Sequence, residues 1–249
     1  MADSEYVPDR VSRTPVLLSL LILGAALVAG IWLRSGLIGT ERWPVSWLDV
    51  EGDLQRTSAS QIRSAAIGPA SAGFFAVDLD EVRNAVEALP WVAGAAVSRQ
   101  WPDALHVRVV EHRPVARWND NRLLSDRGEV FEVTGSQSMQ GMARLVGPEA
   151  RREEVLENWR LMRRQLANVG QDIAGLGVDE RGAWMVELDS GLSLALGREH
   201  MHDRLARYVR VHEKLMAKGR PIAHVDLRYT NGLAVRWAAD AAREAVDHG

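Results

Sequence analysis

The longest hydrophobic run in the chain lies near its N-terminus and extends from Val16 to Leu33. These 18 residues contain no charged side chain, and Arg13 and Arg34 flank them. An α-helix of this length rises about 27 Å, which is close to the thickness of the hydrocarbon layer of a bilayer. A cleaved secretion signal is the alternative, but its hydrophobic core is usually only about 7–15 residues long. The run therefore predicts an uncleaved transmembrane helix at residues 15–34.

The segments on either side of this helix predict its orientation. Residues 1–14 form a short tail with two arginines, which favours a cytoplasmic N-terminus. Residues 35–45 contain two glycines and a proline and are expected to form a linker. The bulk of the chain then lies outside the membrane, which in a bacterium means the periplasm.

The pattern after the linker predicts a small domain at residues 46–114. Its elements are expected in the order β-α-α-β-β, at residues 47–50, 60–67, 78–89, 96–99 and 105–111. Apolar side chains in the second helix recur at the spacing of one helix face, and Asp78 or Asp80 is placed to cap its N-terminus. Gly68-Pro69 and Pro90 are expected to end the two helices.

A second domain is predicted at residues 115–238, followed by a tail at residues 239–249 to which we assign no role. Apolar residues three and four apart mark two helices, at residues 155–169 and 201–215. The remainder alternates between apolar and polar positions, as strands do. We expect one antiparallel, meander-like sheet with two helices.

Hairpins with three-residue loops ending in glycine recur in this domain. Loops at residues 126–128 and 189–191 set Leu124 opposite Val130 and Val186 opposite Leu194. Each pairing keeps apolar side chains on one face of the sheet, as the two-residue period of a strand requires.

The last hairpin spans residues 225–237, with the sequence V-D-L-R-Y-T-N-G-L-A-V-R-W. A two-residue turn at Asn231-Gly232 would mix apolar and polar faces. A three-residue loop ending in Gly232 instead pairs Leu227 with Val235, keeps the apolar residues together, and sets Asp226 opposite Arg236. We therefore expect the second register, with the final strand at the edge of the sheet.

Composition and motifs give no indication of catalysis. The 249 residues carry a formal net charge of -3, so bulk charge does not point to nucleic acid. There is no cysteine, which excludes disulfides, zinc–thiolate sites and thiol nucleophiles. We find no phosphate-binding glycine loop, no G-x-S-x-G elbow and no zinc-protease motif. The protein is expected to be a binding module rather than an enzyme, without cofactor or metal.

Residues 89–118, L-P-W-V-A-G-A-A-V-S-R-Q-W-P-D-A-L-H-V-R-V-V-E-H-R-P-V-A-R-W, resemble the bacterial cell-division family FtsQ/DivIB. The stretch is similar to the second half of that family's POTRA domain, and Val50 to Gly52 matches its first strand. Residues 196–208 and 225–237 resemble the family's C-terminal β domain. The resemblance implies an α+β protein: a transmembrane helix, a POTRA domain (β-α-α-β-β) and an antiparallel β-sheet domain with two helices.

The resemblance also implies a function and partners. Members are scaffolds of the divisome, held in the inner membrane at the septum as single-pass type II proteins. They bind FtsB and FtsL in the periplasm and link early division proteins to the peptidoglycan synthases FtsW and FtsI. In the family, the last strand of the β domain receives a strand from FtsB. Carried over by position, the expected partner-binding residues are Arg228, Tyr229, Asn231, Gly232, Leu233 and Trp237.

Other interpretations remain open from the sequence. Gln100 is assigned to a recruitment surface of the POTRA domain. Tyr229 and Trp237 could instead complete the apolar core face of the last hairpin. POTRA domains also occur in outer-membrane assembly and secretion components, which is the alternative function, but residues 116–237 are too few for a membrane barrel.

Overall fold

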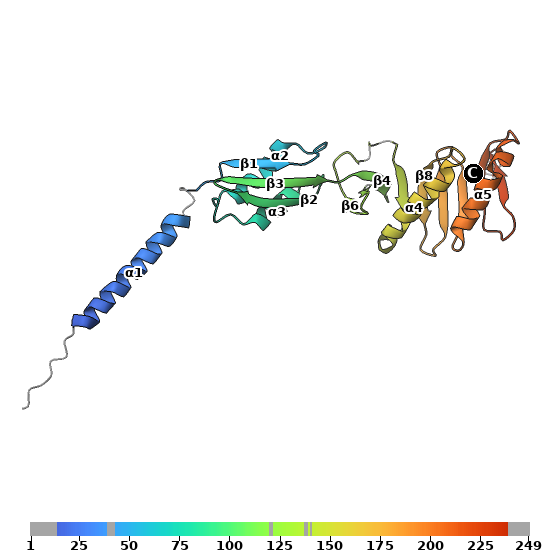
Figure 1. Ribbon diagram of the computed structural model, residues 1–249. Coiled ribbons are helices and arrows are strands. Elements are labelled where there is room, and N and C mark those ends of the chain that lie inside the picture. The colour runs from blue at the N-terminus through green and yellow to red at the C-terminus, as the bar shows by residue number, and fades with distance from the viewer. Residues whose placement is uncertain (1–13, 39–42, 120–121, 137–138, 140, 239–249) are drawn as a thin grey trace, which may run out of the picture. The chain divides into compact units, whose positions relative to one another are not determined.

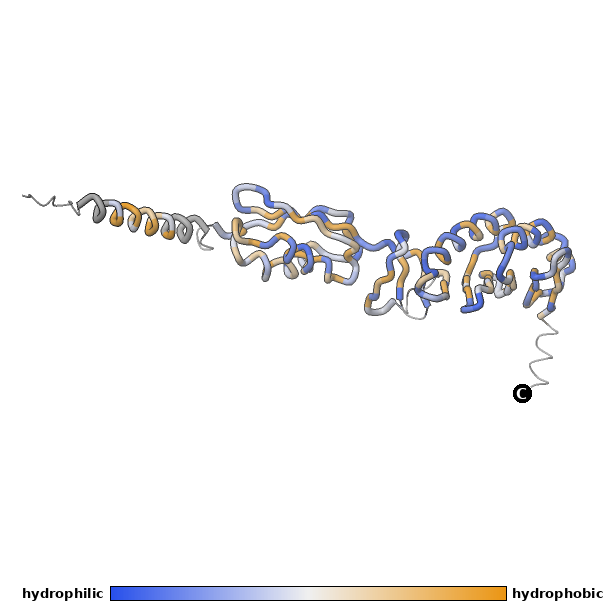
Figure 2. The backbone as a smooth tube through the Cα atoms, turned by 90° about the horizontal axis from the view of Figure 1, so that it is seen from below, coloured by the Kyte–Doolittle hydropathy of each residue, from blue (hydrophilic) through white to orange (hydrophobic). Residues whose placement is uncertain are grey.

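The computed structural model describes residues 14–38, 43–119, 122–136, 139 and 141–238. Helix α1 (Thr14–Ile38) covers the long apolar run (Figure 1), and its side chains are described from residue 19 to residue 31. This part of α1 is mostly hydrophobic (Figure 2). Among the residues described, no helix combines the length and the apolarity that crossing a membrane requires. The anchor predicted at residues 15–34 stays a prediction.

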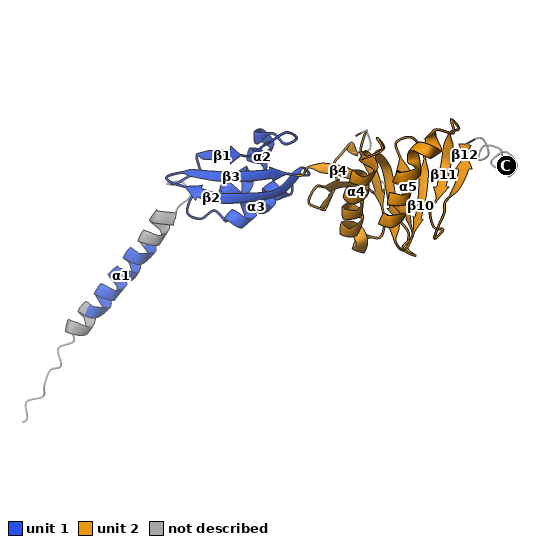
Figure 3. Cartoon of the chain, turned by 45° about the vertical axis from the view of Figure 1, so that its right-hand side comes forward, with its two compact units in different colours: residues 1–111 blue, residues 112–249 orange. Residues whose placement is uncertain are grey.

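The chain divides into two compact units, residues 1–111 and 112–249 (Figure 3). The elements of the first unit after α1 are β1 (Trp47–Glu51), α2 (Ala59–Ala70), α3 (Leu79–Glu87), β2 (Val92–Gln100) and β3 (Ala104–Glu111). The predicted order β-α-α-β-β is confirmed. The sheet order is β1-β3-β2, with β1 parallel and β2 antiparallel to β3. Side chains from α2, α3 and all three strands form one apolar core, which includes Ile62, Val82, Val86, Leu105 and Val107.

Local capping explains where the two helices of this unit begin. Ser58 caps α2 and forms a reciprocal capping box with Gln61, so the helix starts before the predicted Ser60. Asp78 caps α3 by accepting the backbone N–H groups of Asp80 and Glu81. The predicted end of α2 is wrong, because the helix continues through Gly68-Pro69 to Ala70. Pro69 lies in the last turn of α2, and the helix ends one residue after it.

The described residues of the second unit form nine strands and two long helices. Its elements are β4 (Pro114–Trp118), β5 (Arg122–Ser125), β6 (Val130–Phe131), β7 (Ala143–Val146), the 3₁₀ helix η2 (Glu149–Arg151), α4 (Arg152–Ala167), β8 (Ile173–Val178), β9 (Trp184–Leu188), β10 (Ser193–Gly197), α5 (Met201–Met216), β11 (Ile222–Asp226) and β12 (Ala234–Trp237). All strands join one sheet in the order β12-β11-β10-β9-β8-β7-β4-β5-β6. Helices α4 and α5 lie side by side along this sheet (Figures 1 and 3), and their apolar faces complete its core.

The prediction of a purely antiparallel sheet is wrong, because the sheet is mixed. The pairs β4–β7, β7–β8 and β10–β11 are parallel. Helix α4 connects β7 to β8, and α5 connects β10 to β11. Each helix returns the chain to the end of the sheet at which the preceding strand began, so that the next strand runs in the same direction. A crossover of this kind is what a parallel pair needs.

Two of the predicted hairpins have the expected register. Leu124 lies opposite Val130 in β5–β6, and Val186 lies opposite Leu194 in β9–β10. Gly128 and Gly191 end the two loops with φ of 83° and 81°, a left-handed conformation that favours glycine.

Candidate partner-binding edge

Strand β12 lies at one end of the nine-stranded sheet. Within the described part of the chain its only neighbouring strand is β11, so its other side is an open edge. The opposite end of the sheet is β6, which is two residues long. The predicted edge position of the last strand is confirmed, and β12 offers the longer backbone edge of the two.

The register predicted for the last hairpin is wrong by two residues. Asp226 lies opposite Ala234, and Val225 lies opposite Val235, where the prediction paired Leu227 with Val235. A shift of two residues keeps the paired strand residues from His224 to Asp226 and from Ala234 to Arg236 on their expected faces, because side chains alternate with a period of two; the register shifts again between Ile222 and His224. The connection is therefore a wide loop at residues 227–233 rather than a three-residue turn.

Contacts outside the hairpin explain the wide loop. The N–H of Leu227 donates to the carbonyl of Ala195 at 2.9 Å, so Leu227 extends the contact with β10 instead of pairing with β12. Arg207 of α5 donates to the carbonyls of Leu227 and Thr230, at 2.8 and 2.5 Å. One guanidinium thus holds two points of the loop.

The backbone of β12 presents alternate residues to the open edge. The N–H of Ala238 donates to the carbonyl of Pro221, which immediately precedes β11, at 2.9 Å. Backbone N–H and C=O groups alternate in direction along a strand, so Arg236 and Ala234 also point theirs toward β11. The N–H and C=O groups of Val235 and Trp237 therefore point outward, where an added strand would meet them.

Arg228 and Tyr229 lie in the loop beside this edge and are both exposed. Arg228 donates to the carboxylate of Asp226, with the closest approach 2.6 Å, so the predicted pair between Asp226 and Arg236 is replaced by a local one. This hydrogen-bonded guanidinium lowers the pKa of Asp226 below its ordinary value. The Tyr229 side chain is 58% exposed, which excludes it from the core face and leaves its ring available.

Trp237 is half-buried, and two cationic side chains lie over its ring. The guanidinium of Arg220 lies 4.7 Å from the centre of its ring, and the ammonium of Lys218 lies 5.8 Å away. These are cation–π distances. The ring faces side chains of the α5–β11 connection, so it is neither a core residue nor fully open.

The remaining predicted residues have different surroundings. Leu233 is half-buried against the main core, whereas Asn231 and Gly232 are exposed. Gly232 does not adopt the positive φ expected of a loop-closing glycine, and a Cβ atom there would meet nothing within 4 Å. The structure therefore places these residues along one loop and edge but gives no steric need for glycine at position 232.

The sequence around this edge is strongly basic. Between Arg204 and Ala238 there are eight Lys and Arg residues but only two acidic ones, Glu213 and Asp226, in a chain whose formal net charge is -3. A local excess of positive charge attracts an acidic partner and raises its rate of association.

Gln100 lies apart from this edge, in the first unit. It is the last residue of β2 and is exposed beside Trp101. Sequence inspection missed Arg207, whose contacts shape the loop. No local pattern marks Arg207, since its partners lie 20 and 23 residues further along the chain.

Comparison with known proteins agrees with this architecture. The family "Cell division protein FtsQ/DivIB, C-terminal" matches residues 116–228, and "POTRA domain, FtsQ-type" matches residues 43–112. A protein named Cell division protein FtsQ from Xanthomonas campestris pv. campestris is 38% identical over 228 residues, which are 91% of this chain and 82% of the relative. The chain belongs to the FtsQ/DivIB family.

Other FtsQ proteins are similar over comparable lengths. The one from Allochromatium vinosum is 36% identical over 232 residues, covering 91% of this chain and 90% of the relative. The one from Escherichia coli K12 is 33% identical over 230 residues, covering 90% and 83%. The first unit is accordingly an FtsQ-type POTRA domain. The match to the FtsQ/DivIB C-terminal domain ends at Arg228, so the other five predicted partner-binding residues lie beyond it.

Proposed function

We propose that this chain is a divisome scaffold that binds FtsB by accepting a strand on the open edge of β12. FtsL joins the same periplasmic complex, and the complex links early division proteins to FtsW and FtsI. The chain is held at the septum by a single transmembrane helix at residues 15–34. Membership of a cell-division family supports a role in the divisome, and the open edge of β12 supports binding by strand addition.

The edge position of β12 is the observation on which this function depends. An unpaired edge offers N–H and C=O groups that a second chain can satisfy by adding a strand. On β12 these groups belong to Val235 and Trp237. Backbone pairing supplies affinity for any extended segment, so selectivity has to come from neighbouring side chains. Tyr229 and Trp237 are of the types that dominate interfaces, and the surrounding cations favour a segment with acidic residues.

A proline substitution tests strand addition directly. In Val235→Pro the outward N–H is lost while the bonds to β11 stay, because proline is tolerated at edge positions whose N–H faces away from the sheet. Val235→Ala is the matched control, since it removes more of the side chain but keeps the N–H. Affinity of the full-length chain in nanodiscs for the periplasmic part of FtsB is measured by titration, and the fold by circular dichroism.

The expected result is a large loss of FtsB affinity in Val235→Pro and a small one in Val235→Ala. Equal affinities of the proline variant and the unsubstituted chain would exclude strand addition at β12. Equal losses in both variants would assign the effect to the side chain, and binding would then use a different edge or face.

A further inference from the structure

One end of the POTRA domain carries most of its exposed large apolar side chains. Six such residues lie between residues 43 and 111, and five of them gather where the chain enters the domain. We call these five the aromatic end: Trp43, Trp47, Ile67, Phe75 and Trp101. The most exposed are Trp101 and Trp47, at 77% and 71%. Tryptophan is seldom left so open on a soluble surface without a binding role.

Contacts bring the four aromatic residues together from three segments, and Ile67 lines a groove with Trp47. The N–H of Ser46 donates to the carbonyl of Asp103 at 2.9 Å, which sets the start of β1 beside the turn that follows Trp101. The N–H of Phe74 donates to the carbonyl of Trp43 at 2.8 Å, and the rings of Trp43 and Phe75 meet edge to face at 5.6 Å. The aromatic end is therefore one contiguous surface.

Two grooves meet at Trp47, and one of them extends to Trp101. One, of about 370 Å³, is lined by Trp47, Trp101 and Gln100 together with Arg63. The other, of about 270 Å³, is lined by Trp47, Arg63 and Ile67. The cationic Arg63 lines both grooves beside apolar side chains, and Asp49 also lines the first. A cation next to apolar side chains suits a bilayer surface, where lipid phosphates lie just above the acyl chains.

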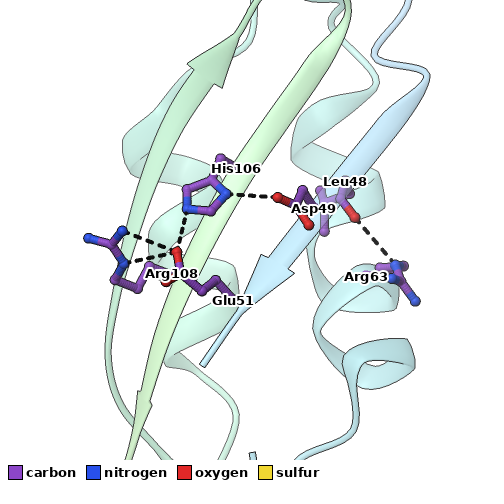
Figure 4. Close-up of polar contacts among 6 residues, drawn as sticks. All are labelled: Leu48, Asp49, Glu51, Arg63, His106 and Arg108. Carbon is purple, nitrogen blue, oxygen red and sulfur yellow. Dashed lines mark hydrogen bonds and ion pairs between the residues drawn. The ribbon is translucent and has the colours of Figure 1, made fainter. Parts of the chain in front are cut away.

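The other end of the same open sheet face is polar and internally paired. His106 of β3 contacts Asp49 at 3.1 Å and Glu51 at 3.0 Å, both from β1, and Arg108 contacts Glu51 at 3.1 Å (Figure 4). Glu51 lies four residues beyond Trp47, roughly 13 Å further along the strand. The face thus changes from aromatic to charged with distance from residue 43, as expected of a surface that is partly immersed in an interface.

The short stretch of chain between Ile38 and Trp43 limits the distance between the aromatic end and α1. Five residue steps separate Ile38, where α1 ends, from Trp43. A fully extended chain spans at most about 18 Å over such a distance. If residues 15–34 cross the bilayer, the aromatic end cannot leave the neighbourhood of its outer surface.

We propose that the aromatic end rests on the headgroup layer of the bilayer that holds α1. This inference rests on the proposed membrane anchor and adds a second, interfacial contact to it. Trp47 and Trp101 supply the amphipathic rings, and Arg63 supplies a cation for lipid phosphate. The contact restricts the tilt of the POTRA domain relative to the membrane plane.

The absence of cysteine from the chain allows a site-specific test. The full-length chain is reconstituted into vesicles of phosphatidylcholine and phosphatidylglycerol, with one fluorophore at Ser46→Cys or at Gln55→Cys. Ser46 lies at the aromatic end, and Gln55 lies at the opposite end, where its N–H donates to Glu111. Quenching by a nitroxide on the lipid headgroup is measured after flotation of the vesicles.

Several-fold stronger quenching at Ser46→Cys than at Gln55→Cys is expected. The added pair Trp47→Asp and Trp101→Asp should reduce quenching at Ser46→Cys to the level at Gln55→Cys. Val110→Asp is the matched control and should leave it unchanged, because Val110 is the sixth exposed apolar residue and lies at the polar end. Circular dichroism checks that each variant is folded.

The outcomes separate this inference from the anchor. Chains that float with the vesicles but show equal quenching at both positions would overturn the lipid contact and leave the anchor intact. Chains that do not float would overturn the anchor and the lipid contact with it. Absence of lipid quenching together with cross-linking of unlabelled Ser46→Cys to a second copy would overturn the lipid contact and assign the aromatic end to a protein interface.

Discussion

The open edge of β12 and the aromatic end of the POTRA domain are exposed surfaces of different chemistry. At β12 the groups available for binding are backbone N–H and C=O groups. Cationic side chains surround them, and the rings of Tyr229 and Trp237 flank the edge. At the aromatic end β1 is also an edge strand, since among the described strands it pairs only with β3, but the side chains exposed there are mainly indole rings and an aliphatic chain. The first surface combines an open edge with a local excess of positive charge, whereas the second is dominated by exposed apolar rings.

The difference teaches that exposure of a tryptophan does not by itself identify a protein interface. Trp237 is less exposed than Trp47, but it lies on a backbone edge and between cations. Trp47 also lies on an edge strand, since β1 pairs only with β3 in the part of the chain that the structure describes, but its ring is far more exposed, at 71%. Specific recognition is therefore expected at β12, and a general interfacial contact at the aromatic end.

The largest expected effect separates the two tryptophans. Trp237→Ala should weaken binding of the periplasmic part of FtsB by about 2 kcal/mol or more, as truncation of an interface hot spot does. Trp47→Ala is the matched control and should leave this affinity unchanged. Titration calorimetry of the full-length chain measures both. Equal losses in the two variants would remove the distinction between the surfaces.

A second prediction concerns the independence of the two units. The Glu111 carboxylate accepts the backbone N–H groups of Gln55, Arg56 and Thr57, at 2.6 to 3.1 Å. Glu111→Gln should lower the free energy of unfolding of the POTRA domain by about 1–2 kcal/mol, because hydrogen bonds to a charged acceptor are lost. Glu87→Gln, which affects a single N–H donor, is the control and should cost less. FtsB binding at β12 should not change in either variant.

The same carboxylate predicts a pH dependence. Partial burial raises the pKa of Glu111, but the N–H donors of Gln55 and Thr57 outweigh it, and the net pKa lies below the ordinary value of 4.5. A carboxylate whose pKa is lowered in the folded state stabilises the fold at pH values above its unfolded pKa. This stabilisation is lost as the pH falls through the lower pKa of the folded state. The difference in free energy of unfolding between Glu111→Gln and the unsubstituted chain, measured by thermal unfolding, should therefore become smaller below pH 4.5. A constant difference would contradict this assignment.

Salt should affect the two surfaces differently. Raising sodium chloride from about 0.1 M to about 1 M shortens the screening length from about 10 Å to about 3 Å. FtsB binding at the basic β12 region should weaken several-fold. Quenching of the label at Ser46→Cys by phosphatidylcholine vesicles should stay nearly constant, because its main contribution is apolar. Parallel losses would indicate that both contacts are electrostatic.

The smallest effect is expected at Arg228. Its guanidinium already pairs with Asp226, so a partner carboxylate would have to share it. Arg228→Gln should reduce FtsB affinity only slightly, since exposed ion pairs contribute little. It should also return the pKa of Asp226 toward its ordinary value of 3.8, measurable by NMR titration. A loss as large as that of Trp237→Ala would instead make Arg228 a central contact.

Local patterns in the sequence were sufficient for much of this architecture. The capping residues, the helix faces and the alternation of the strands predicted β-α-α-β-β in the first unit. Two hairpins were predicted in register because a short loop with a left-handed glycine and an apolar face are properties of adjacent residues. The edge position of the last strand was also predicted, whereas the partner-binding residues beside it came from the family resemblance and stay a prediction.

The tertiary structure decided what depends on distant partners. Parallel pairing of β7 with β8 and of β10 with β11 requires helices to pack back across the sheet, and no alternation within a strand encodes that choice. The register of the last hairpin was set by Arg207 and by the bond from Leu227 to Ala195, both contacts with elements outside the hairpin. The sequence by itself determined which face the side chains within the strands occupy, because that follows from a two-residue period; Tyr229, which lies in the loop, is exposed instead. Only the folded chain determined which residues lie opposite one another, because register also depends on hydrogen bonds to distant residues.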